Sequence, residues 1–160
     1  MQTTLNAIRS HSPCASGWSK LLASLGKTKA DDEPLSILTI LESNGLDDAL
    51  WCLRAVTGHD REIRLYAVWC ARQVQHLMTD QRSIAALDVA ERFANGQATV
   101  GELTASEDAA WDAAGDAARA AAGDAALAAG WDAAWAAAGD AARDAQKAKL
   151  IAICNNAGDL

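Results

Sequence analysis

A four-residue repeat occupies most of the last third of the chain, from Thr104 to Leu150, and it constrains the fold more than any other feature. Each unit begins with Asp or Ala, continues with two small residues and ends in a variable residue. Alanine is the best helix former, so this segment is expected to be helical. The Asp positions of the repeat are Asp108, Asp112, Asp116, Asp124, Asp132, Asp140 and Asp144.

The period of this repeat does not match the period of an α-helix. One residue advances the helix by about 100°, so four residues advance about 40° past a full turn, and the Asp row winds around the helix. A single straight helix would be about 70 Å long, with acid on every side. We therefore expect either an interrupted helical hairpin, with Gly123 or Gly130 near the break, or one long helix wrapped by its neighbours in a right-handed sense.

The rest of the chain has apolar residues at helical spacing, bounded by capping residues and glycines. Helices are expected over 13–25, 34–44, 47–56, 60–78 and 80–95, and the Ala-rich helix is expected to begin at Thr104 or Ser106. No strand is expected. The predicted fold class is all-α: a multi-helix bundle, or an arrangement of HEAT-like helix pairs, with an Ala-rich C-terminal long helix or interrupted helical hairpin.

The length of 160 residues suits a single all-helical domain. Within residues 1–160, composition distinguishes an N-terminal helical part (1–103), an Ala/Asp/Trp-rich helical part (104–154) and a short tail (155–160).

The negative charge is concentrated towards the C-terminus. Of a net charge of −7, residues 1–103 contribute 12 acidic and 10 basic side chains, and residues 104–160 contribute 9 and 4. Direct nucleic-acid binding needs clustered Lys and Arg, so this distribution argues against it. It permits a protein partner with a basic surface, a homodimer, or simply good solubility.

The sequence gives no sign of secretion or of a membrane span. No apolar core of a signal peptide occurs in Met1–Ile8, and no uncharged apolar run approaches the ~18 residues of a membrane span. The four cysteines are dispersed, without a C-x-x-C pair. These observations favour a cytoplasmic protein.

No pattern typical of catalysis or metal binding is present. The three histidines are scattered, and the chain has no P-loop, no G-x-S-x-G and no H-E-x-x-H motif. We expect a protein that is not an enzyme and that needs no metal and no cofactor.

The aspartates and tryptophans of the repeat are the candidate binding residues. The carboxylates fit a solvated face, or a spaced row that imitates a phosphate backbone. The tryptophans are expected to pack against residues 13–96, the alternative being that one or more is exposed as an interface anchor. The candidates for partner binding are Asp112, Asp116, Asp124, Asp132, Asp140, Trp111, Trp131 and Trp135.

Residues 60–150 resemble a family of small helical proteins known as immunity proteins of bacterial toxin systems, which has relatives in phage genomes. The resemblance rests on two helix motifs and the Ala/Trp-rich tail that follows them. The matching positions are Ala67, Cys70, Ala71, Arg72, Val74, Asp80, Arg82, Ala86, Leu87, Ala90, Glu91 and Gly96. In the tail, Asp and Gly replace many of the Arg and Ala positions of the family.

The resemblance implies a non-catalytic inhibitor that binds and neutralises another protein by steric and electrostatic occlusion. Together with the acidic repeat, it makes an immunity-like inhibitor the first hypothesis. One alternative is a phage-borne anti-defence protein of the anti-CRISPR type, acting as a nucleic-acid mimic. A second alternative is a self-assembling structural helical module.

Overall fold

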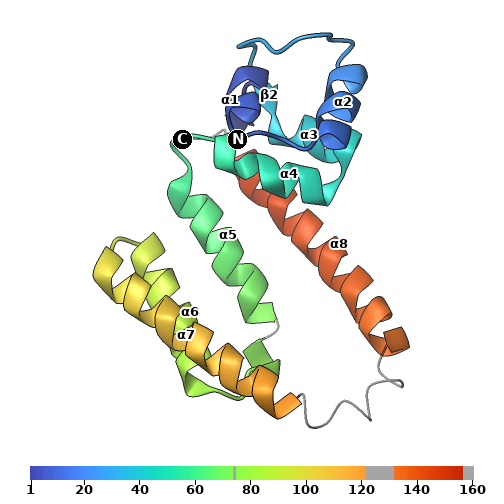
Figure 1. The fold of residues 1–160 in the computed structure, drawn as a ribbon. Helices are drawn as coiled ribbons and strands as arrows, with labels where there is room; N and C mark the ends of the chain where they lie inside the picture. The colour runs from blue at the N-terminus through green and yellow to red at the C-terminus, as the bar shows by residue number, and fades with distance from the viewer. Residues whose placement is uncertain (74, 122–131, 157–160) are drawn as a thin grey trace. The chain divides into compact units, whose positions relative to one another are not determined.

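Helices make up most of the protein, as its computed structural model shows (Figure 1). The structure describes residues 1–73, 75–121 and 132–156, without the side chains of residues 77 and 113–138. In these residues it has eight α-helices, two 3-10 turns and one two-stranded sheet. The predicted all-α, multi-helix bundle class is therefore confirmed.

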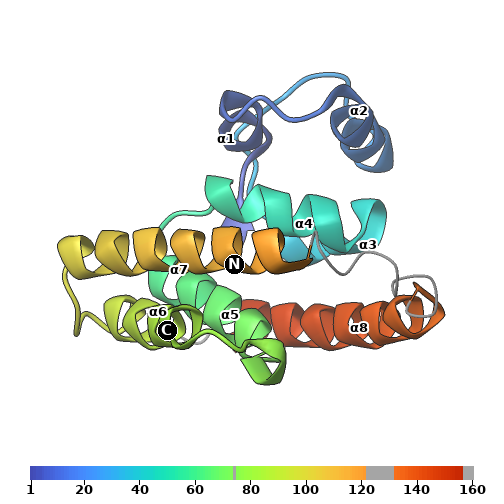
Figure 2. The same cartoon turned by 60° about the horizontal axis from the view of Figure 1, so that its bottom comes forward.

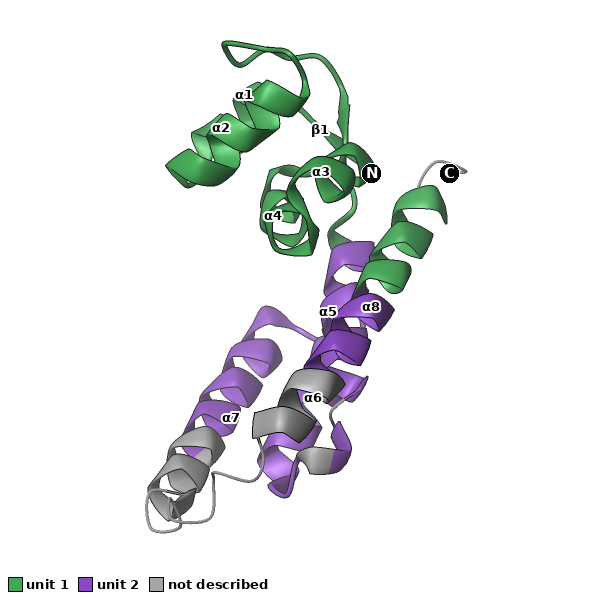
Figure 3. Ribbon diagram, turned by 90° about the vertical axis from the view of Figure 1, so that its right-hand side faces the viewer, with its two compact units in different colours: residues 1–60, 147–160 green, residues 61–146 purple. Residues whose placement is uncertain are grey.

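The chain divides into two compact units (Figure 3). Unit 1 consists of residues 1–60 and 147–160, and unit 2 consists of residues 61–146. These boundaries differ from the boundary at 103–104 that composition suggested. They also fall within helices: most of α5 (Asp60–Gln73) belongs to unit 2, and α8 (Asp132–Asn156) contributes to both units.

Unit 1 joins short helices to a small antiparallel sheet. Its elements are β1 (Gln2–Thr3), α1 (Leu5–Ser10), α2 (Ala15–Ser24), β2 (Leu35–Ser36), α3 (Ile37–Asn44), α4 (Leu46–Cys52), the 3-10 turn η1 (Leu53–Ala55) and the end of α8. In the sheet, Gln2 is opposite Ser36 and Thr3 is opposite Leu35.

The core of unit 1 is apolar and fully buried at its centre. Leu5, Ile8, Ile37, Ile40 and Leu150 are the largest side chains that are at most 1 % exposed. Their removal from water is the main driving force for folding of this unit.

Hydrogen bonds tie the N-terminal segment into unit 1. The N-terminal ammonium of Met1 donates to the carbonyl of Cys154 at 3.2 Å. Nearby in sequence, the buried hydroxyl of Thr3 donates to the carbonyl of Ala55 at 2.6 Å. These bonds satisfy polar groups that burial would otherwise leave unpaired.

Unit 2 is built from longer helices, and few of its described side chains are buried. Its elements are α5, the 3-10 turn η2 (Gln75–Leu77), α6 (Gln81–Ala94), α7 (Val100–Ala121) and the first part of α8. Figure 2 shows α6 and α7 side by side, joined by a short loop. Such a loop between packed helices makes them an antiparallel pair.

Polar contacts connect the helices of unit 2. Arg72 of α5 donates to Asp88 and Glu91 of α6, at 2.8 and 2.6 Å. The hydroxyl of Tyr66 in α5 donates to the carbonyl of Gln146 in α8 at 3.2 Å. Burial raises the pKa of Tyr66, so this phenol remains a donor at neutral pH.

Three of the predicted starts of elements are wrong. The helix expected from residue 34 begins at Ile37, because Leu35 and Ser36 pair with β1 and the Ser36 hydroxyl then caps the helix. Helix α2 begins at Ala15 with Cys14 as its N-cap, because Ser12, the residue before the predicted start, has a φ of 57°, in the left-handed region, whereas a residue that caps a helix start normally has an extended backbone.

The third wrong start is that of the Ala-rich helix, which begins at Val100 and not at Thr104 or Ser106. Whether this segment breaks near Gly123 or Gly130 stays a prediction, since both residues lie outside the described part of the chain. In the described residues, α7 packs closely against α6.

Candidate protein-binding surface

Helix α7 begins at a reciprocal cap formed by Thr99 and Glu102. The Thr99 hydroxyl accepts from the Glu102 backbone N–H at 3.2 Å, while the Glu102 carboxylate accepts from the backbone N–H of Thr99 at 2.8 Å. This is a capping box, which satisfies donors that a helix start leaves without partners. The bond from the Thr99 N–H lowers the pKa of Glu102, so the cap is ionised at neutral pH.

The cap fixes the register of the residues that follow, including Trp111. The Trp111 side chain is 78 % exposed, although Trp is a residue that proteins normally keep largely covered. The prediction that the tryptophans pack against residues 13–96 is therefore wrong for Trp111. An exposed aromatic side chain of this size is typical of an interaction site.

Trp111 stands at the edge of an apolar groove between α6 and α7. The groove has a volume of about 410 Å³, and Ala86, Leu87 and Ala90 of α6 form one wall. The opposite wall, on α7, includes Leu103 and Ala110. The small side chains keep this surface low, so the indole is its largest projecting group.

A second hollow of about 390 Å³ extends this groove towards α5. It shares Leu87, Ala90 and Leu103 with the first hollow and adds residues of α5 such as Ala67 and Val68. The two hollows therefore form one apolar surface within unit 2, which we call the α6–α7 groove.

Acidic side chains border the groove beside Trp111. Glu107, Asp108 and Asp112 are all exposed on α7. Counting about 100° per residue, Glu107 lies about 40° to one side of Trp111, and Asp108 and Asp112 lie about 60° and 100° to the other. The indole therefore projects from a row of carboxylates, and we call these four residues the acidic-aromatic face.

The structure brings only part of the predicted residue set together. Trp111 and Asp112 are neighbours on α7, and Asp140 is exposed on α8 without a described contact to them. Asp116 lies in α7, and Asp132 and Trp135 lie in α8, but their side chains are outside the description. Asp124 and Trp131 lie outside the described residues.

Sequence reasoning missed Glu107 and Asp108 as members of the surface. Placing the helix start at Thr104 or Ser106 assigned them to a first turn, whereas the start at Val100 places them in the middle of α7. The signal was present as Thr99-Val100-Gly101-Glu102, the sequence of a capping box.

Residues 1–73, 75–121 and 132–156 hold no group of three or more His, Cys, Asp or Glu side chains that could bind a metal ion. In the same ranges, no helix has both the length and the apolar character needed to cross a membrane. Comparison of the chain with protein-family models, curated proteins and solved structures finds no match. The candidate surface thus rests on its own geometry.

Proposed function

We propose that this chain is a non-enzymatic, immunity-like inhibitor that binds a protein with a basic surface through the acidic-aromatic face of α7. The observation that supports this most is the 78 % exposure of Trp111 between an apolar groove and a row of carboxylates. Large aromatic anchors surrounded by polar groups supply most of the binding energy of many protein interfaces.

The parts of this surface have separate roles in the proposed complex. The Trp111 indole inserts into a pocket of the partner, while an apolar ridge of the partner fills the α6–α7 groove. Glu107, Asp108 and Asp112 attract a basic partner over a distance and orient it on encounter. Neutralisation then follows because the partner's own functional surface is covered in the complex, in the cytoplasm where both proteins would meet.

The charge distribution agrees with this division of roles. Unit 2 contains 13 acidic and 7 basic residues, whereas unit 1 contains 8 and 7. The negative field of the protein therefore originates mainly from the unit that contains Trp111. Such a field increases the association rate with a positively charged partner and is weakened by salt.

The test is capture of partners from lysate of the host, followed by titration of the purified partner and by a growth assay in cells that express it. Trp111→Ala should weaken binding by about thirtyfold or more, as expected for a central anchor. Neutralising Glu107, Asp108 and Asp112 to Gln, Asn and Asn should slow association and reduce its salt dependence. Both variants should lose protection of growth.

A matched control neutralises three exposed carboxylates outside α7: Asp32→Asn, Glu42→Gln and Asp144→Asn. Equal loss of binding in this control would contradict a specific role for α7. A partner released by DNA or RNA competition would support the nucleic-acid-mimic function in place of the immunity-like one. A homodimer in light scattering that Trp111→Ala dissociates would support self-assembly.

A further inference from the structure

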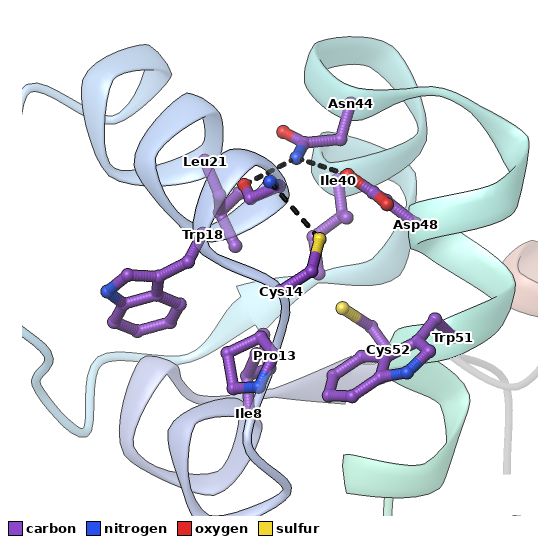
Figure 4. A pocket seen from close by; sticks show the side chains of 11 residues that line it. Ile8, Pro13, Cys14, Trp18, Leu21, Ile40, Asn44, Asp48, Trp51 and Cys52 are labelled. Atoms are coloured by element: carbon purple, nitrogen blue, oxygen red, sulfur yellow. Dashed lines mark hydrogen bonds between the residues drawn. The ribbon is translucent and has the colours of Figure 1, made fainter.

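A separate cavity lies in unit 1, far in sequence from α7. It is a cavity of about 100 Å³ bordered by residues of α1, α2, α3 and α4 and of the segment before α2 (Figure 4). Its apolar walls include Ile8, Leu21 and Ile40, which also belong to the core of unit 1. The cavity thus adjoins the core of unit 1.

Two tryptophans, Trp18 of α2 and Trp51 of α4, line this cavity. The position of Trp51 is fixed by Arg54, whose guanidinium lies over the indole at 4.4 Å and whose Nε donates to the Trp51 carbonyl at 2.9 Å. Indole faces attract cations through their ring quadrupole. The cavity therefore combines aliphatic and aromatic walls, and Arg54 already lies over one face of the Trp51 indole.

The one charged side chain that lines the cavity is the carboxylate of Asp48. Its Oδ2 accepts a hydrogen bond from Asn44 Nδ2 at 2.7 Å, and the same amide donates to the Gly17 carbonyl at 2.9 Å. The Oδ1 atom accepts no hydrogen bond from the residues that the structure describes. Asn44 thus holds the carboxylate in place, and its Oδ1 keeps hydrogen-bonding capacity that no described residue uses.

Gly17 lets the Asp48 carboxylate lie close against α2. A Cβ atom at this position would lie 2.8 Å from Asp48 Oδ2 and 3.1 Å from Cys14 Sγ, both closer than normal contact. Gly17 lies in the first turn of α2, and the absence of a side chain there leaves room for both atoms. A side chain there would push the carboxylate out of its position.

From these observations we propose that the cavity binds a small primary alkylammonium ion, with its N–H donating to Asp48 and its alkyl group between Trp18 and Trp51. No Lys or Arg is among the residues that line the cavity, so the charge at its wall is that of Asp48. A cavity of about 150 Å³ holds benzene in another protein, so about 100 Å³ suits a ligand of about five non-hydrogen atoms. This site is independent of the function proposed for α7.

The experiment is a titration of the full chain with isobutylammonium at neutral pH, followed by ¹H–¹⁵N NMR, with isobutanol as the neutral analogue of the same size. The indole N–H signals of Trp18 and Trp51 should shift, and the cation should bind about tenfold more tightly than the alcohol, since hydrogen bonds to charged groups are roughly twice as strong. Asp48→Asn should reduce this preference to less than twofold. Glu42→Gln, an exposed carboxylate of the same unit, should leave it unchanged.

Two further variants change residues that line the cavity. Gly17→Ala should abolish binding of both compounds; if this variant does not fold, Trp18→Leu should weaken the cation more than the alcohol. Equal affinity of the two compounds for the wild-type protein would overturn the proposal, leaving an apolar cavity without preference for charge. Absence of any shift up to high millimolar concentration would overturn it as well.

Discussion

The two units of this protein are stabilised in different ways. Unit 1 encloses large aliphatic side chains such as Ile37 and Ile40, both 0 % exposed, whereas among its described side chains unit 2 buries Tyr66, Val68 and Ala94. Unit 2 instead has ion pairs between its helices, such as Arg72 with Asp88 and Glu91. One unit thus removes apolar surface from water, while the other leaves apolar and charged surface exposed.

This difference has a consequence for function. The surface that a protein exposes at a cost in stability is the surface available for binding, and exposed apolar patches are often functional for this reason. In unit 2 the exposed surface is the α6–α7 groove with Trp111 and its neighbouring acids. In unit 1 the candidate site is partly open to solvent, and some of its lining residues, such as Ile8 and Ile40, belong to the core.

The largest effect is expected when the same substitution, Ile to Ala, is made in each unit. The comparison tests whether the two units differ in burial. Ile37→Ala should lower the free energy of unfolding by about 2–5 kcal/mol, because it leaves a cavity around a fully buried position. Ile84→Ala, at a half-buried position of α6, should cost about 1 kcal/mol, since part of that side chain already contacts water. Urea denaturation followed by circular dichroism measures both values. Equal losses would contradict the comparison.

The sequence predicted best those elements whose ends have strong local signals. Helix α6 begins after the Asp80 cap and ends before Gly96, which has a φ of 70°, and both ends were expected. The two strands were not expected, because a two-residue strand has too few residues to show a period. Helix α1 has only six residues and was missed for the same reason.

The candidate site could be predicted only in part. The repeat identified Trp111 and Asp112 as candidates, because an Ala-rich helix has few other side chains able to bind. It could not show that Trp111 is exposed, since this depends on which helix covers α7 and on how much of the length of α7 that helix covers. Leu87 and Ala90, which form the groove beside the indole, come from α6, and their pairing with α7 is a tertiary contact without a local signal.

An intermediate effect is expected from the ion pairs of unit 2. Arg72→Gln removes bonds from α5 to Asp88 and Glu91, whose side chains are partly exposed. Exposed pairs contribute little, so the free energy of unfolding should fall by about 1 kcal/mol or less, and by less still in 1 M salt. Arg9→Gln, at an exposed position of α1, should lower the free energy of unfolding by less than Arg72→Gln does. This loss should not become smaller in 1 M salt as the loss for Arg72→Gln does. A loss that is equal at low and high salt would show that Arg72 acts through packing and not through charge.

The smallest effect concerns the caps of the helices, one of which, in unit 2, is a carboxylate that titrates. In unit 1 the hydroxyls of Thr4 and Ser36 cap α1 and α3, whereas in unit 2 the carboxylate of Asp80 caps α6. Hydrogen bonds from Arg82, first from its side chain and then from its backbone N–H, lower the pKa of Asp80 from its ordinary 3.8 to about 2.

A carboxyl group whose pKa is lower in the folded state stabilises the protein above its ordinary pKa, and this contribution is lost as the pH falls from about 4 to about 2. Asn can cap a helix as Asp does but does not titrate. The wild type should therefore melt at a higher temperature than Asp80→Asn at pH 6, and the difference should shrink as the pH falls below about 4. Ser36→Ala is the control from unit 1, because its effect involves no titrating group and should not change over this range. The melting temperatures of all three proteins are measured by circular dichroism between pH 6 and pH 2.5. A difference between the wild type and Asp80→Asn that stays constant over this range would show that the bond to Arg82 does not stabilise the folded state.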